Sequence, residues 1–179
     1  MKKYIFFIFS VVILFYCCKQ NDEQNTKSTQ PISKSTSSIN VSSIEDLYIE
    51  NDSLTTHLLS ELNKIVLDSR FTIEKSLIEN RHVDNLKDTI ITRTYANTSI
   101  KSYKTVSEEW IIEASIENND FKLNDFVAVG VGKKVVEKSF GITINTALLK
   151  IRNLEQTSQF ILKFENGYLK KVEYEGYVD

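Results

Sequence analysis

The two cysteines of this chain stand side by side at positions 17 and 18. A nearly unbroken run of apolar residues from Tyr4 to Tyr16 precedes them and follows the cationic start Lys2-Lys3. As a helix this run would extend roughly 20 Å, which is too short to cross a bilayer core of about 30 Å. The run is typical of the hydrophobic region of a signal peptide, and a cysteine directly after it is the pattern of a lipoprotein precursor.

Cys18 is the predicted site of lipid attachment, because the residue before it is the small Cys17, whereas Cys17 itself follows the bulky Tyr16. Modification of its thiol and cleavage would remove residues 1–17 as the signal peptide. The segment resembles the loose lipoprotein signals of the Bacteroidetes, in which an acidic stretch soon after the cysteine, here Asp22-Glu23, is linked to surface display. The resemblance implies a palmitate-carrying lipoprotein of the cell envelope, held in the outer membrane on its periplasmic or surface face. The alternative is an ordinary secretory signal with coincidental cysteines.

The charge of the chain argues against a nucleic-acid partner. The formal net charge is −2, and removal of Lys2 and Lys3 with the signal peptide takes it to −4. Nucleic-acid binding normally requires a net basic face. No cysteine follows position 18, so the folded part has no disulfide framework, no cysteine nucleophile and no thiolate metal ligand.

The remaining residues of catalytic type do not stand in a catalytic pattern. His57 and His82 are the only histidines, and neither has a second metal ligand two to four residues away. No serine lies in a nucleophile-elbow glycine pattern. The carboxylates of Glu108-Glu109 and of Asp120 and Asp125 fit solvated turns better than a calcium loop. We therefore expect no catalytic residue, no metal and no cofactor.

The sequence from Gly130 to Lys134, Gly-Val-Gly-Lys-Lys, is the nearest approach to a phosphate-binding loop. A Walker A loop is longer and ends in Gly-Lys-Ser/Thr, and a dinucleotide-binding turn needs a third glycine where this chain has Val135. The sequence predicts no nucleotide partner.

Three aromatic residues, Tyr95, Tyr103 and Trp110, lie on neighbouring predicted strands and form a candidate interaction surface. Aromatic side chains exposed on one face of a sheet would suit contact with a protein or a glycan. The alternative for Trp110 is a place in the core.

The elements that would position these residues lie in a single predicted domain, residues 44–179. Residues 18–43 are rich in Ser, Thr, Asn, Gln and Lys and predict a flexible linker. Apolar residues spaced along one helical face predict a helix over 54–66, capped by Asp52 or Ser53. Stretches rich in β-branched residues predict strands at 71–73, 89–95, 99–103 and 109–116, with a turn at 96–98 and another at 118–120.

A hairpin near the C-terminus has the clearest local signal. Phe160, Leu162 and Phe164 alternate with other residues, and Asn166-Gly167 supplies the positive φ angles of a tight turn. Apolar residues on the return strand are first three and then two residues apart, which predicts a β-bulge near Lys170-Lys171.

Residues 126–141 predict a strand, a glycine turn, a short helix and a glycine stop, with Val135, Val136 and Phe140 facing the sheet and Gly141 as C-cap. Together with the hairpin this pattern resembles the SmpA/OmlA outer-membrane assembly lipoproteins and the β-lactamase-inhibitor-like domains, over roughly residues 121–176. This chain has Gly132 where their signature usually caps the helix with Ser or Thr. The resemblance implies a domain that works by contact with other proteins, without catalysis.

The sequence thus predicts an α+β domain with short helices packed on a mostly antiparallel sheet, following a lipoprotein signal and a linker. The favoured hypothesis is a non-enzymatic interaction or assembly module of the envelope, with an envelope protein as its partner. The alternative hypothesis is a small surface protein that binds or hydrolyses carbohydrate.

Overall fold

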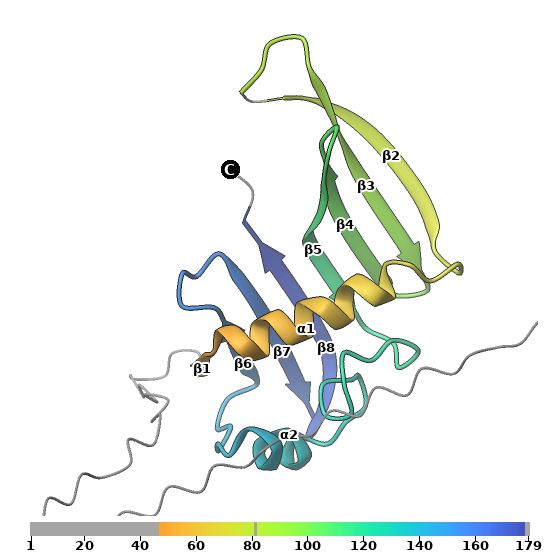
Figure 1. Cartoon of the computed structure of the whole chain (residues 1–179). Helices are drawn as coiled ribbons and strands as arrows, with labels where there is room; N and C mark the ends of the chain where they lie inside the picture. Colours follow the sequence, from red (N-terminus) through yellow and green to blue (C-terminus); the bar gives the residue numbers. More distant parts are fainter. Residues whose placement is uncertain (1–46, 81, 178–179) are drawn as a thin grey trace, which may run out of the picture. The chain divides into compact units, whose positions relative to one another are not determined.

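The computed structural model describes residues 47–80 and 82–177 of the chain. Within these residues the chain forms two helices and one sheet of eight strands, an α+β fold (Figure 1). All but one of the strand pairings are antiparallel, so the predicted fold class is confirmed for this part of the chain. The predicted signal peptide, the predicted lipid-attachment residue Cys18 and the predicted linker lie outside the described residues.

Helix α1, Asp52–Ile65, is the predicted first helix. Its buried positions, Thr55, Leu58, Leu62 and Ile65, recur at three- and four-residue spacing and therefore share one face. The cap differs from the prediction, because Asn51 Oδ1 accepts the hydrogen bond from the Leu54 N–H at 2.9 Å. An extended residue just before the first turn is best placed for that bond.

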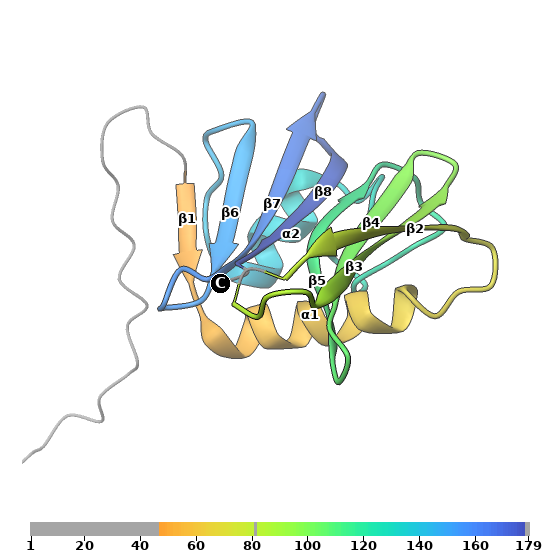
Figure 2. The same cartoon turned by 90° about the horizontal axis from the view of Figure 1, so that it is seen from above.

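The strands run in the order β1-β6-β7-β8-β5-β4-β3-β2 across the sheet (Figure 2). The two outermost strands are β1, Leu47–Glu50, and β2, Thr72–Glu79. β1 pairs in parallel with β6 and was not predicted. The inner strands are β3 Lys87–Tyr95, β4 Thr98–Lys104, β5 Glu109–Ile116, β6 Leu148–Arg152, β7 Ser158–Glu165 and β8 Tyr168–Gly176.

The predicted C-terminal hairpin is confirmed as β7 and β8. Asn166 and Gly167 adopt positive φ angles of 51° and 80° in the turn. Lys163 pairs with Lys171 and Phe164 with Leu169, so Lys170 is the extra residue of a bulge at the predicted place.

Helix α2, Lys133–Phe140, follows Gly132 and ends at Gly141, whose φ of 66° is left-handed, as predicted. Two details of this prediction are wrong. Residues 126–129 form a loop instead of a strand, because Asn124 Oδ1 accepts hydrogen bonds from the N–H groups of Phe126 and Val127. Val135 is 49% exposed, and only Val136 of the helix is fully buried.

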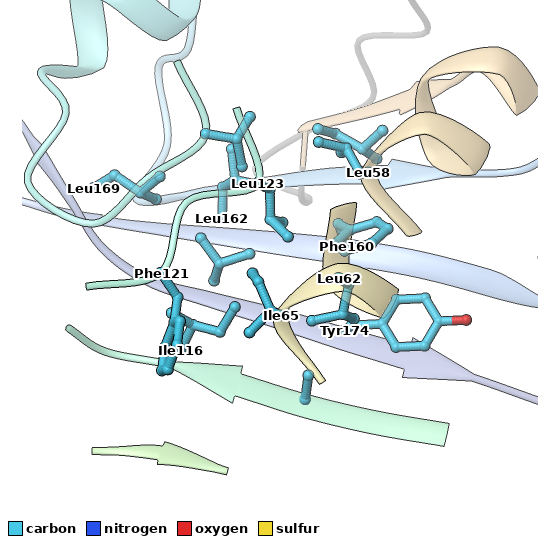
Figure 3. Close-up of a cluster of buried hydrophobic side chains, with 14 of the residues drawn as sticks. Leu58, Leu62, Ile65, Ile116, Phe121, Leu123, Phe160, Leu162, Leu169 and Tyr174 are labelled. Atoms are coloured by element: carbon cyan, nitrogen blue, oxygen red, sulfur yellow. The ribbon is translucent and has the colours of Figure 1, made fainter. Parts of the chain in front are cut away.

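The core lies between one face of the sheet and both helices. Leu58, Leu62 and Ile65 of α1 gather with Phe160, Leu162 and Tyr174 of the β7–β8 hairpin in one cluster (Figure 3). Each fully buried leucine or phenylalanine contributes about 1.5–3 kcal/mol to stability. We call the opposite side of the sheet the open face; it carries Lys101, Tyr103, Trp110, Glu113, Lys163 and Glu173, each next in sequence to a buried residue on the core side.

Candidate interaction surface

Tyr103 of β4 and Trp110 of β5 lie directly opposite each other in the sheet register. Their ring centroids are 5.1 Å apart and the rings are tilted by 34°. The neighbouring residues Ser102 and Ile111 are buried on the core side, so the alternation of the strands places the aromatic pair on the open face. Both aromatic side chains are half-buried. The pair is therefore partly accessible, on a face that neither helix packs against.

A buried carboxyl group supports Tyr103 from the adjacent strand. Asp88 of β3 is only 1% exposed, and its Oδ2 accepts hydrogen bonds from Tyr103 Oη at 2.5 Å and Asn80 Nδ2 at 2.6 Å. Its other oxygen, Oδ1, is buried and has no hydrogen-bond partner among the described residues. Burial of a carboxyl group is costly unless it accepts hydrogen bonds. The bond from Tyr103 therefore stabilises the buried Asp88, and Asp88 in turn holds the Tyr103 hydroxyl in place.

Asn80 also orders the turn that follows β2. Its Oδ1 accepts hydrogen bonds from the N–H groups of His82 and Val83, both at 2.8 Å. One amide side chain thus connects the β2–β3 turn to Asp88 and, through it, to Tyr103. This network has no signal in the sequence, since Asp88 is an isolated acidic residue within a β-branched strand.

Tyr95, the third aromatic residue of the predicted surface, lies elsewhere. Its ring packs edge-on against Phe71 and Phe121, and the guanidinium of Arg70 lies 4.8 Å from its centroid. Tyr95 pairs with Thr98 across the β3–β4 turn, and Tyr103 is five residues further along, so the two tyrosines point to opposite faces. Counting alternate residues along both strands, through the two-residue turn, would have assigned the two tyrosines to opposite faces from sequence alone.

Ion pairs lie on the open face, on the strands β4 and β5 of the aromatic pair and on β7 and β8. Lys101 Nζ lies 2.7 Å from Glu113, and Lys163 Nζ lies 2.7 Å from Glu173, which also contacts Lys171. Burial disfavours the charged form of Glu173, but hydrogen bonds from Lys163 and Lys171 outweigh this and lower its pKa. Of these pairs, Lys101–Glu113 lies on the two strands that carry Tyr103 and Trp110 and would contribute to a polar rim beside the aromatic residues.

The histidines and carboxylates of the described residues do not assemble a metal site. No group of three or more His, Cys, Asp or Glu side chains that could hold a metal ion occurs in ranges 47–80 and 82–177. His57 lies at the edge of a cavity of about 450 Å³ between β1, α1 and α2, together with Glu50, Ser139 and Phe140. Asp120 contacts Arg70 at 3.6 Å and belongs to the surface near Tyr95.

The glycine loop before α2 uses its N–H groups within the domain. The N–H of Gly130 donates to the Leu169 carbonyl and that of Lys133 to the Gly167 carbonyl, both at 2.8 Å. The Val131 N–H donates to the Ala128 carbonyl. A phosphate-binding loop instead directs such groups towards its ligand. The loop joins α2 to the β7–β8 hairpin.

In the part of the chain that the structure describes, no helix is long and apolar enough to cross a membrane. No family model, no curated protein and no solved structure matches the chain.

Proposed function

We propose that this chain is a lipid-anchored, non-enzymatic binding module of the cell envelope, which holds an envelope protein on its open face. The observation that carries the proposal is the pair Tyr103–Trp110, presented side by side on that face. Large aromatic residues surrounded by polar contacts dominate the binding energy of many protein interfaces.

The surroundings of the pair favour a preformed site. Asp88 fixes the Tyr103 hydroxyl, so the ring loses little freedom when a partner binds. Val106, in the loop between β4 and β5, is 83% exposed and extends the apolar surface beyond the two rings. The charge-paired neighbours Lys101 and Glu113 add a rim that selects partners by charge.

The anchor is the second part of the proposal. Lipid on Cys18 would attach the module to the outer membrane, and the linker over residues 18–43 would let it reach partners near the surface. The resemblance to the SmpA/OmlA assembly lipoproteins supports this assignment at the level of the class of function.

A glycan is the second candidate for the ligand. Two neighbouring, partly accessible aromatic rings are suited to stacking on a sugar, and the exposed charged groups of Lys101 and Glu113 are suited to hydrogen bonds with its hydroxyl groups. This reading uses the same residues with a different ligand.

Proximity cross-linking and pull-down from intact cells test the proposal. The native chain is compared with Trp110→Ala, with Cys18→Ala, and with Tyr168→Ala as a control for an exposed aromatic residue outside the surface. We expect specific envelope proteins to be enriched by the native and Tyr168→Ala chains and lost with the other two.

Equal enrichment by the native and Trp110→Ala chains would reject the open face as the binding surface. If no protein is enriched, binding to envelope polysaccharides is measured with the same variants. Binding of the native chain, but not of Trp110→Ala, to these polysaccharides would then favour a glycan as the ligand.

A further inference from the structure

Strand β2 forms one outer edge of the sheet, and all but one of its residues are exposed. It pairs with β3 on one side, and its other side has no strand neighbour in the described chain (Figures 1 and 2). Exposed apolar side chains, Ile73 at 54% and Leu77 at 68%, lie along it. Such an edge is a template for pairing with a further strand. We propose that β2 pairs antiparallel with β2 of a second copy of this chain, about a two-fold axis at Leu77.

The backbone groups available for this pairing follow from the ladder with β3. The Asn80 N–H donates to the carbonyl of Leu86, its opposite residue, at 2.9 Å. Hydrogen-bonded pairs alternate along an antiparallel ladder, so residues 72, 74, 76 and 78 direct their backbone groups towards β3. The N–H and C=O groups of Ile73, Lys75, Leu77 and Glu79 therefore point outwards.

The side chains of these same four residues select one register. A two-fold axis perpendicular to the sheet pairs residues of the same face, so odd positions meet odd positions. An axis at Leu77 places Leu77 opposite Leu77 and Lys75 opposite Glu79 of the other copy, on both sides of the axis. An axis at Lys75 would oppose two lysines, and an axis at Ser76 would set Lys75 against Leu77. Of these three registers, only the one with its axis at Leu77 matches both charges and the apolar residue.

The charges on β2 are available for this arrangement. Lys75 is exposed and makes no ion pair with the other described residues. Glu79 lies 3.4 Å from Lys87, but both side chains are more than half exposed, so the carboxylate can accept a second lysine. Opposite charges directly across a strand pair are stabilising and like charges are destabilising. Lys75 thus favours the register with its axis at Leu77, in which it faces Glu79. It disfavours the register with its axis at Lys75, in which two lysines would face each other.

Pairing through one edge strand buries little surface, and a weak association is expected for the free chain. Attachment of both copies to one membrane would raise their effective concentration and favour the pair. Only this membrane effect rests on the proposed anchor; the pairing itself uses neither Tyr103 nor Trp110.

Disulfide trapping in intact cells that make the full chain tests the proposal. In a hydrogen-bonded antiparallel pair the Cα atoms are about 5.5 Å apart, within the range that a disulfide bridges. With mild oxidant, Leu77→Cys is therefore expected to form a covalent dimer on a non-reducing gel. The parent chain controls for Cys17 and Cys18. Leu154→Cys, between β6 and β7, controls for a thiol away from β2, because Leu154 is 63% exposed and Leu77 is 68% exposed.

Charge reversal in the Leu77→Cys background tests the register. Lys75→Glu or Glu79→Lys alone is expected to reduce the trapped dimer about fivefold or more, and both together to restore it. A Leu77→Cys chain that is trapped no more than Leu154→Cys would overturn the pairing. A dimer insensitive to the single reversals, or not restored by the double one, would overturn the Leu77 register. Trp110→Ala in the same background is expected to leave trapping unchanged, which separates this result from the proposed binding function.

Discussion

The hydroxyl of Tyr103 donates a hydrogen bond of 2.5 Å to the carboxyl of Asp88, joining a half-exposed ring on β4 to one of the most deeply buried polar groups of the domain. The candidate surface is thereby coupled to the stability of the sheet beneath it. Tyr103 contributes its ring to the open face and its hydroxyl to the hydrogen bond with the buried Asp88 on the same side of the sheet.

Replacement of Tyr103 by phenylalanine separates these two roles. The ring remains for binding, but Asp88 retains only the hydrogen bond from Asn80, and the unfolding free energy is expected to fall by about 1–3 kcal/mol. The fluorescence of Trp110, the only tryptophan, reports unfolding in urea. Tyr168→Phe is the control, since that side chain is more than half exposed and a change within about 0.5 kcal/mol is expected. Equal stability of the two variants would contradict a supporting role for the hydroxyl.

The ion pair between Arg93 and Glu109 is expected to contribute more to stability than the pairs on the open face. Arg93 is nearly buried on the core side of β3, where it donates to Ser102 Oγ at 2.9 Å and to Glu109 at 2.7 Å. Glu109→Ala leaves the guanidinium without its carboxylate, and a loss of about 2–4 kcal/mol is expected.

Glu113→Ala is the matched control, because it breaks the exposed pair with Lys101 and is expected to cost less than about 1 kcal/mol. Both variants are compared by urea unfolding. If Glu109→Ala lowers the unfolding free energy no more than Glu113→Ala, the Arg93–Glu109 pair contributes no more to stability than the exposed pair.

Local sequence signals predicted the elements whose contacts are local. The spacing of Leu58 and Leu62 identified α1, and the parity of apolar residues around Lys170 located the bulge. Strand β1 was missed because its four residues are a strand only through pairing with β6, about a hundred residues later. A parallel pairing of this kind leaves no turn signal in the sequence.

The candidate site was predicted only in part, because pairing between strands brings its residues together. Tyr103 and Trp110 were chosen by residue type and strand assignment, and the register brings them together. Asp88 accepts hydrogen bonds from Asn80, just after β2, and from Tyr103 on β4, and composition could not predict these contacts. Residues 126–129 have the composition of a strand, but hydrogen bonds that the N–H groups of Phe126 and Val127 donate to Asn124 Oδ1 hold them as a loop.

Asp68 is expected to make the stability of the fold fall at acidic pH. Hydrogen bonds from the Arg70 side chain, followed by its backbone N–H, lower the pKa of Asp68 from 3.8 to about 2. A carboxyl with a lowered pKa in the folded state stabilises the fold above pH 3.8, and this contribution is lost as the pH falls through about 2. The native chain should therefore lose its advantage over Asp68→Asn between these pH values.

Urea midpoints of both chains from pH 2 to pH 6 measure this difference. Glu155→Gln, at an exposed position, controls for the loss of one negative charge. A gap between the native chain and Asp68→Asn that stays constant over the whole pH range would exclude the Arg70 contact as its cause.

The N-terminus of α2 offers a substitution that is expected to stabilise the domain. Gly132 is the N-cap, with an extended φ of −66° that any residue adopts, and it provides no side-chain hydrogen bond. A Cβ atom added there meets no atom within 4 Å. The N–H groups of Lys133 and Val135 already donate to the carbonyls of Gly167 and Gly132. The hydroxyl of Gly132→Ser can accept from the N–H of Lys134 in the same turn, and a gain of a few tenths of a kcal/mol is expected. Gly132→Ala adds the same Cβ without the oxygen, so the difference between the two unfolding free energies isolates the cap, and equal values would show that the first turn of α2 does not require one.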